Sequence, residues 1–524
     1  MCGPYLCNAA LCTHAALQAG SVLVHVPDSI MISPPQALKS DIGDILAGCD
    51  GLFTGDDDLM LTAFLLRQRH LGSESLWAPY LAALPTPTSI LNWTQQQLLQ
   101  LQDTHMIAKA RSREAAMQQK HARMLGALQL HFPGRFPPEA LTYPAFRWAW
   151  MTVQARAFGR RLPWTALVPF ADSLNHANTP VKYDFNVDGN GAFRLFSSGG
   201  AGTPPGQEVF NSYGRRSNQH LALEYGFAMP NNEWAHTSVQ LSKGAHPPHA
   251  AIVHLSRAQL PISGVFKCYW NKWNLEVVEF LRVCLSTEEQ LNEHSPAALL
   301  EASLDWTREV SVLQAARDAF VAALQAYPTS LEADLQACKA AGVEFSPGVD
   351  FAVLESAVAA AGKSSGEHAL ISPTAATLDA AEDIACSLAA LVAQGQEGVA
   401  AGTVDDVLDG AEGLDAARRT AALVHRTSCK LILAQQAAWS HSSSMLARMA
   451  AASTCTAVGS GKAGIPRGSA PLQWAQSLLH AAEERSCAAA TDPHPALAPS
   501  TAVSADTTTD AEGAAAALPG KTAQ

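Results

Sequence analysis

The chain has 524 residues, which is too long for one ordinary hydrophobic core and suggests about three structural units. Hydrophobic residues make up 48% of the chain, and the net charge is -12 with no block of Lys or Arg, which argues against a nucleic-acid-binding groove. The 11 scattered cysteines are typical of reduced thiols in an intracellular protein, and no apolar run approaches the ~20 residues of a membrane span. We therefore expect a soluble intracellular monomer with neither a nucleic-acid partner nor a membrane partner.

The N-terminal part is predicted to hold one strand followed by helices. Residues 18–33 alternate apolar and polar side chains up to Pro27, which indicates a strand. Residues 57–145 carry apolar side chains at helical spacing, and Thr94 with Gln97 forms a plausible capping box for one of the helices. A further helix is predicted by four residues that share one face: Phe146, Trp150, Val153 and Ala157.

The spacing of apolar residues then changes to the alternation that is typical of β-strands. Apolar residues alternate over 183–187 and over 193–195, and the Asp-Gly-Asn-Gly run at 188–191 between them is a strong signal for a hairpin turn. A glycine- and proline-rich loop at 199–206 leads to a short predicted strand at 208–212. The sequence therefore predicts a small antiparallel sheet in this part of the chain.

The C-terminal half is predicted to be helical and then disordered. Residues 245–440 are helical in pattern and increasingly rich in alanine, with a flexible insertion predicted within 340–410. Residues 450–524 contain mainly Ala, Ser, Thr, Gly and Pro, so they bury too little apolar area to offset the entropy of ordering, and we interpret them as a disordered tail.

Four segments between 147 and 227 carry the residues that are most informative about function. They are Arg147 to Arg156, the LVPFADSLNH run at 167–176, the GQEVFNSYG run at 206–214, and Asn218 to Phe227. Considered alone, His176 is most simply interpreted as a hydrogen-bonded structural residue, and Tyr213 as a core aromatic residue. The run from Asp172 to Asn175, considered alone, is most simply a turn or a helix cap. The ordered set of four segments favours a shared functional role over these separate structural ones.

The four segments resemble those of the SET-domain methyltransferases, in the branch typified by the Rubisco large-subunit methyltransferase and the actin-histidine methyltransferase. Later pieces at 327–334 and 426–433 resemble the substrate-binding helical domain of that branch, and the similarity spans about residues 18–440. The resemblance implies an α+β SET domain over 1–236, with small sheets, a threaded pseudoknot and a helical insert at about 57–145. It implies an all-α substrate-binding domain over 245–440, ahead of the disordered tail.

The resemblance also implies an activity, which is the transfer of a methyl group from S-adenosylmethionine to a lysine or a histidine of a non-histone protein. Such a transfer needs a neutral amine, and removing the proton of a free lysine at pH 7 costs about 4 to 5 kcal/mol. An apolar channel beside a sulfonium recovers much of that cost, and a tyrosine hydroxyl can orient the nitrogen lone pair. The reaction requires no metal, and the sequence predicts none.

The resemblance to the Rubisco-like branch leaves the cytoplasm and the chloroplast as the compartments to consider.

The resemblance assigns roles to eight residues of this chain. Tyr213 is the expected catalytic tyrosine, and Tyr225 and Arg160 are expected to contact the substrate. The residues expected to bind the cofactor are Arg156, Asp172, Asn175, His176 and Phe227.

The chain departs from the family pattern at its start and at two later positions. The Gly-x-Gly turn that wraps the cofactor in the family is not recognisable in the opening MCGPYLCNAALCTHAALQAG, which suggests either a truncated start or weak cofactor binding. Ala155 occupies a position where serine is usual, and Gln207 a position where glutamate is usual. These departures keep open a second hypothesis, a SET fold that has lost catalysis and serves as a protein-binding module.

Overall fold

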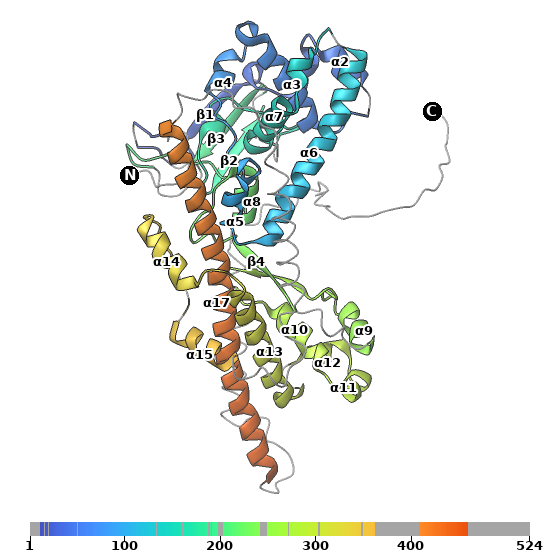
Figure 1. Ribbon diagram of the computed structural model, residues 1–524, viewed down its shortest axis with the longest axis vertical. Helices are drawn as coiled ribbons and strands as arrows, with labels where there is room; N and C mark the ends of the chain where they lie inside the picture. The colour runs from blue at the N-terminus through green and yellow to red at the C-terminus, as the bar shows by residue number, and fades with distance from the viewer. Residues whose placement is uncertain are drawn as a thin grey trace, which may run out of the picture.

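The computed structural model describes residues 11–459 apart from Ala15, Ala19, Asp50, Pro133, 160–161, 187–188, Asn190, 198–202, 242–248, Asn271, 302–303, 347–348, Asp350 and 362–407. The molecule is elongated, with the N-terminal strands and helices in its upper half and a second group of helices in its lower half (Figure 1). One very long helix, α17 (Leu408–Gly459), runs alongside both halves.

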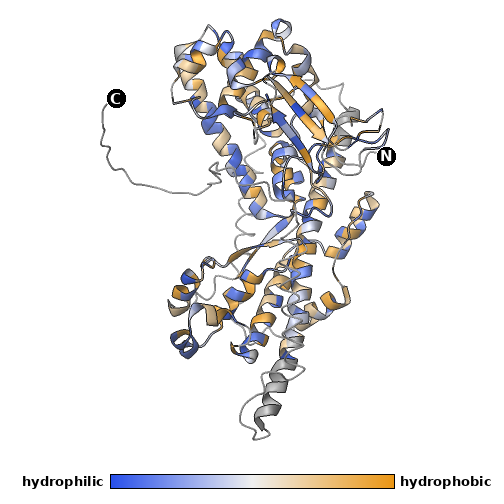
Figure 2. Cartoon of the chain, turned by 180° about the vertical axis from the view of Figure 1, so that it is seen from behind, coloured by the Kyte–Doolittle hydropathy of each residue, from blue (hydrophilic) through white to orange (hydrophobic). Residues whose placement is uncertain are grey.

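A three-stranded antiparallel sheet forms the β part of the upper half. Its strands β1 (Val22–Pro27), β2 (Val181–Phe185) and β3 (Ala192–Ser197) are arranged in the order β1-β3-β2. Tyr183 pairs with Leu195 in the predicted hairpin, although Asp188 and Asn190 of its turn lie outside the described residues. Parts of these strands are coloured orange, for hydrophobic residues, in Figure 2. Phe193 and Leu195 of β3 are fully buried in the core beneath the sheet.

Helices surround this sheet and make up most of the upper half. The described helices here are α1 (Pro34–Lys39), α2 (Gly43–Gly48), α3 (Asp57–Leu71), α4 (Ala78–Ala83), α5 (Gln95–Leu99), α6 (Thr104–His131), α7 (Tyr143–Arg156) and α8 (Asn218–Tyr225). The capping box predicted at Thr94 and Gln97 is present at the start of α5. Phe146, Trp150 and Val153 are buried on one face of α7, as the sequence predicted, and α7 packs against α3. Ala157, the fourth residue of the predicted face, lies beyond the helix, because α7 ends at Arg156 and Ala157 is its extended C-cap.

The lower half is mainly helical, with one two-stranded sheet that the sequence did not predict. Strands β4 (His236–Gln240) and β5 (Val265–Tyr269) pair antiparallel, so β5 lies inside a segment predicted to be all helix. The alternation of exposed and buried residues along β5 explains the strand, because only every second side chain faces the core. The helices are α9 (His249–Arg257), α10 (Leu275–Cys284), α11 (Glu288–Glu293), α12 (Pro296–Leu300), α13 (Trp306–Gln325), α14 (Leu331–Ala340) and α15 (Phe351–Ala361).

Helix α17 packs along α13 in the lower half, and its middle turns contact α8 and α5 of the upper half. The backbone of this helix continues to Gly459, so the first ten residues of the predicted tail, 450–459, are helical. The remaining tail, 460–524, and most of the predicted flexible insertion, 362–407, lie outside the described residues. No helix in the described part of the chain has both the length and the apolarity needed to cross a bilayer.

The strand predicted at 208–212 is reduced to two isolated bridges. Glu208 bridges to Cys12 on one side, and Asn211 bridges to His176 on the other. The amide of Val209 accordingly donates to Leu11, whereas the amide of Asn211 donates to Asn175. Because the segment changes partner within three residues, no continuous ladder forms, and the segment instead brings residues 175–176 next to Tyr213.

Candidate active site

A cavity of about 360 Å³ lies in the upper half, where the four sequence segments converge. Its volume falls within the range that is usual for small-molecule sites. The cavity is lined by seven of the eight residues singled out from the sequence: Arg156, Asp172, Asn175, His176, Tyr213, Tyr225 and Phe227. The eighth, Arg160, lies outside the described residues.

The Asp172 carboxylate forms a buried polar corner of the cavity. The Arg156 guanidinium, at the last residue of α7, donates to the Asp172 carbonyl over 3.0 Å and lies 3.4 Å from its carboxylate. The Tyr80 hydroxyl donates to the same carboxylate over 2.7 Å. Burial raises the pKa of Asp172, whereas Arg156 and Tyr80 oppose that shift by stabilising the charged form.

Tyr213 and His176 are held together face to face. Their rings stack with centroids 4.9 Å apart, and the Tyr213 amide donates to Nδ1 of His176 over 3.1 Å. The Tyr213 hydroxyl donates to the carbonyl of Leu174 over 3.0 Å. These contacts fix the tyrosine ring against the 174–176 segment, so the hydroxyl points along that segment rather than into solvent.

The protonation state of His176 follows from its surroundings. Burial lowers the pKa of His176 to about 4, so the imidazole is neutral at pH 7. Since Nδ1 accepts a hydrogen bond, the proton of the neutral ring is on Nε2. That Nε2–H is buried and has no hydrogen-bond partner among the described residues. It is therefore a donor available to a molecule in the cavity.

Asn175 joins the two strand-like segments on another side of the cavity. Its backbone carbonyl accepts from the Asn211 amide over 2.8 Å, and its side-chain amide donates to the Glu208 carboxylate over 2.6 Å. The backbone of 175–176 is thus pinned against 208–211, which places polar main-chain groups beside the cavity. This is the region where the sequence predicted a threaded segment.

An aromatic wall closes the opposite side of the cavity. The rings of Tyr213 and Tyr225 have centroids 4.6 Å apart, and Phe227 lies 6.1 Å from Tyr225. Burial raises the pKa of Tyr225 to about 12, so its hydroxyl is protonated at pH 7. Gly226 separates the two aromatic residues with a φ of 81°, which ends α8 and turns the chain.

Hydrogen bonds from distant segments hold this wall in place. The Thr88 hydroxyl donates to the Tyr225 carbonyl over 2.6 Å, and the Pro85 to Thr88 segment itself lines the cavity. The Asn218 side chain donates to the carbonyl of Met229 and accepts from its amide, over 2.9 and 3.1 Å. Both ends of the turn that carries Phe227 are therefore anchored.

Two unpartnered atoms indicate what the cavity can bind. The Nε2–H of His176 is a buried donor, and Oδ1 of Asp172 is a buried acceptor without a partner among the described residues. Buried polar atoms are normally hydrogen-bonded, so these two atoms fit a ligand that has both acceptor and donor groups.

The sequence did not assign a role to three residues of this site. Tyr80, Glu208 and Thr88 each line the cavity or bond directly to a residue that does. Tyr80 lies within the span of about residues 18–440 that resembles the family, and this resemblance is the only signal for it in the sequence. Nothing local to Glu208 or Thr88 indicates a partner so far away along the chain.

Comparisons with known proteins show which proteins this chain is similar to. The family described as Rubisco LSMT substrate-binding matches residues 253–359. The actin-histidine N-methyltransferase of Canis lupus familiaris is 26% identical over 61% of this chain and 57% of its own length. SET domain-containing protein 4 of Mus musculus is 31% identical over 43% of this chain and 53% of its own length. The chain thus spans a little over half the length of the curated relatives that it matches.

The fold has a counterpart among solved structures. A structure of Rubisco LSMT bound to AdoMet matches with a TM-score of 0.55 at 19% identity, covering 87% of this chain and 90% of that chain. The matched architecture is an α+β SET domain with small sheets and a helical second domain, which agrees with the predicted fold class. By its fold, its substrate-binding match and these two relatives, the chain is therefore similar to Rubisco LSMT, to actin-histidine methyltransferase and to SET domain-containing protein 4.

Proposed function

We propose that this chain is an S-adenosylmethionine-dependent protein N-methyltransferase that modifies a lysine side chain of a non-histone protein. The observation that carries the proposal is the convergence of Tyr213, His176 and Tyr225 on one cavity with unpartnered polar atoms at its edge. The names of the relatives support a methyltransferase, because one is an actin-histidine N-methyltransferase and one solved neighbour is Rubisco LSMT bound to AdoMet.

The residues present fit S-adenosylmethionine. When bound, this cofactor supplies a methyl group from its sulfonium. The unpartnered donor of His176 and acceptor of Asp172 match the ring nitrogens, amino group and carboxylate of such a molecule. Asn175 and His176 would hold it through their side chains and backbone, Arg156 through Asp172, and Phe227 by ring packing.

Tyr213 is the proposed catalytic residue, and its hydrogen bonds suit that role. The hydroxyl proton is directed to the Leu174 carbonyl over 3.0 Å, which leaves the oxygen oriented to accept an N–H from a target amine. An amine held in this way presents its lone pair in a fixed direction, which is the requirement for an in-line displacement. Stacking on His176 keeps the tyrosine ring from rotating away.

The aromatic wall also favours the reactive form of the acceptor. A lysine must lose its proton before it can be methylated, which costs about 4 to 5 kcal/mol at pH 7 in water. Desolvation destabilises the ammonium and lowers its pKa. The burial that raises the pKa of Tyr225 to about 12 indicates that the environment disfavours charge in the same region.

Lysine fits the cavity better than histidine. The adjoining aromatic rings of Tyr213 and Tyr225, tilted by 32° to one another, suit the straight aliphatic stem of lysine. A neighbouring structure, Rubisco LSMT bound to sinefungin and monomethyllysine, supports the same preference, whereas the actin-histidine relatives favour the alternative.

A protein substrate is supported by the second domain. The substrate-binding match at 253–359 falls inside the lower helical half, and that half is joined to the cavity-bearing half through α17. A separate domain of this size suits the recognition of a folded protein surface rather than of a free amino acid. Tyr225 is the residue of the cavity that we expect to contact the target, and the sequence resemblance adds Arg160, which lies outside the described residues.

The test combines cofactor binding with methyl transfer. Purified wild-type chain should show a thermal shift with S-adenosylmethionine and should transfer labelled methyl groups into a cell extract, with methyl-lysine identified by mass spectrometry. Tyr213→Phe should bind the cofactor but lose transfer at least about tenfold. Tyr269→Phe, at an exposed tyrosine of β5, is the matched control and should behave as wild type.

Each result has a definite meaning for the proposal. The absence of a cofactor-induced shift in the wild-type chain contradicts the proposal and favours the binding-module hypothesis. Undiminished labelling by Tyr213→Phe removes Tyr213 from the catalytic role. Methylhistidine in place of methyl-lysine corrects the acceptor and leaves the reaction class intact.

A further inference from the structure

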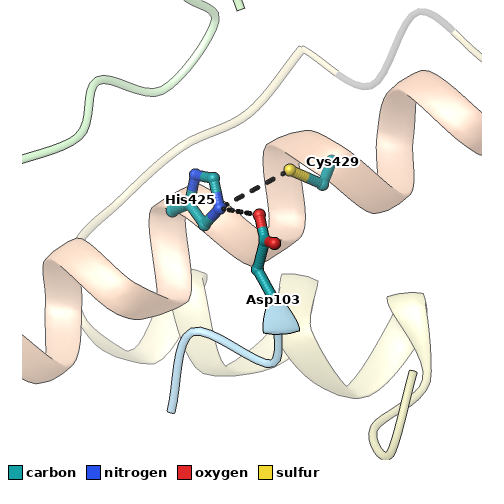
Figure 3. Close-up of side chains that lie close together, drawn as sticks. All are labelled: Asp103, His425 and Cys429. Carbon is teal, nitrogen blue, oxygen red and sulfur yellow. Dashed lines mark hydrogen bonds and ion pairs between the residues drawn. The ribbon is translucent and has the colours of Figure 1, made fainter. Parts of the chain in front are cut away.

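Three potential metal ligands meet at the joint between the two halves, away from the cavity described above. Asp103 comes from the turn before α6, whereas His425 and Cys429 lie one helical turn apart on α17 (Figure 3). Asp103 and His425 are 322 positions apart in sequence. In the part of the chain that the structure describes, these residues form the one such group of three whose donor atoms all lie within 4.8 Å of one another.

The distances match those between ligands of one metal ion. Nε2 of His425 lies 3.0 Å from Oδ2 of Asp103 and 3.8 Å from Sγ of Cys429. Tetrahedral zinc with ordinary bond lengths of about 2.0 to 2.3 Å holds its ligand atoms roughly 3.3 to 3.6 Å apart. The observed spacings fall on either side of this value, so only small side-chain shifts are needed to enclose an ion.

The arrangement is not explained by a catalytic triad. In a triad, the two ring nitrogens of the histidine face different groups, one facing the carboxylate and the other the nucleophile. Here the same nitrogen, Nε2, faces both Asp103 and Cys429, and Nδ1 has no partner among the described residues. One ring nitrogen can form one linear hydrogen bond, whereas a cation between the three groups satisfies all of them.

The supporting contacts also suit a metal site. Asp103 is the N-cap residue of α6, and its Oδ1 accepts a hydrogen bond from the Met106 amide over 2.9 Å. This hydrogen bond orients the other carboxylate oxygen, Oδ2, toward His425. His425 is fully buried and Cys429 nearly so, so the ion would be shielded from water.

We propose that Asp103, His425 and Cys429 bind a divalent transition-metal ion that joins the helical insert to α17. The mixed oxygen, nitrogen and sulfur donor set favours zinc, with a water molecule in the fourth position. Binding removes the thiol proton of Cys429, which is released to solvent.

The location gives the ion a structural role. Ser428, beside Cys429, accepts a hydrogen bond from Asn218 over 3.1 Å, and Asn218 in turn holds Met229 near the cavity. The insert and the lower half are therefore joined at the same turns of α17 that contact α8. An ion there stabilises the joint between the halves without taking part in the proposed methyl transfer.

The test is metal titration of the full chain after treatment with a chelator. Cobalt(II), used as the probe, should bind at one equivalent and produce the thiolate-to-cobalt charge-transfer band with the visible spectrum of a tetrahedral site. Zinc should then displace it. Cys429→Ser and Asp103→Asn should each weaken binding by at least about tenfold. Asn caps a helix as well as Asp does, so Asp103→Asn preserves the start of α6.

A matched control separates this site from general thiol binding. Cys268→Ser removes another buried thiol, on β5, and should leave the cobalt band and affinity unchanged. Zinc should also raise the Tm of the wild-type chain but not that of Asp103→Asn, a readout that does not depend on the folding of Cys429→Ser. The proposal is overturned if the wild-type chain gives no thiolate band and no zinc-dependent Tm change, or if Cys429→Ser and Asp103→Asn bind as tightly as wild type.

Discussion

Replacing Gly226 by alanine should damage both stability and the cavity. Gly226 follows α8 with a φ of 81°, and a Cβ built there would lie 2.0 Å from the carbonyl oxygen of Thr88. The neighbouring segment, Pro85 to Thr88, lines the cavity. The substitution therefore tests whether the aromatic wall depends on the close approach of these two backbones.

The magnitude follows from two separate effects. The left-handed backbone alone costs an alanine about 1 to 2 kcal/mol. The Thr88 carbonyl must also retreat by roughly 1.5 Å to reach a normal van der Waals separation. That movement breaks the hydrogen bonds from Thr88 to Tyr225 and from Ser89 to Leu223, each contributing about 1 kcal/mol. Gly226→Ala should therefore lower the unfolding free energy by roughly 3 to 4 kcal/mol.

Gly55→Ala is the matched control, because Gly55 has a φ of 80° and open space around its Cβ position. It should cost only the backbone term of about 1 to 2 kcal/mol. Urea unfolding of the two variants and wild type gives the comparison, and titration with S-adenosylmethionine should show weaker binding by Gly226→Ala alone. Equal destabilisation by the two variants would show that the contact with Thr88 has no energetic consequence.

Three further predictions concern buried polar groups. Burial lowers the pKa of His236 to about 4, below the 6.5 of a histidine in the unfolded chain. The unfolded chain therefore binds a proton at this site at a higher pH than the folded chain does, so the free energy of unfolding should fall as the pH decreases from 6.5 to 5. In urea unfolding, His236→Gln should make that pH dependence less steep. Glu309→Gln should cost about 3 to 5 kcal/mol in the same assay, because it leaves the buried Arg282 without its carboxylate partner. Tyr80→Phe should lower the unfolding free energy by about 1 to 3 kcal/mol, because the buried Asp172 carboxylate loses a donor, and an unchanged midpoint would contradict that hydrogen bond.

Local patterns predicted the elements that depend on neighbouring residues. The capping box at Thr94 and Gln97 and the pairing of Tyr183 with Leu195 are both present, because each is set within a short stretch of chain. Strand β5 was missed because the expectation of a helical domain outweighed the alternation in its five residues. The strand predicted at 208–212 is interrupted because its partners lie in two different segments, which no local pattern records.

The candidate site was predictable only as a set of residues, and not as a geometry. The resemblance to the family identified Asn175, His176 and Tyr213 as candidate site residues, and in the structure all three line one cavity. The orientation of His176, with Nδ1 accepting from the Tyr213 amide, arises from backbone positions that the sequence does not specify. The same holds for the contact of Tyr80 with Asp172, which joins residues 92 positions apart.

Long-range hydrogen bonds connect the two halves through α17. Arg426 on α17 donates to the Gln100 carbonyl of the upper half and to the Asp334 carboxylate of the lower half, over 2.9 and 3.0 Å. Two residues later, Ser428 bonds to Asn218, whose side chain fixes the backbone beside Phe227. A protein bound to the lower half that rotates α17 must therefore disturb the backbone next to the cavity. Ser428→Ala removes the hydrogen bond that Asn218 donates to Ser428 and leaves the residues of the cavity unchanged. This variant should therefore weaken any effect that protein binding at the lower half has on the affinity for the cofactor.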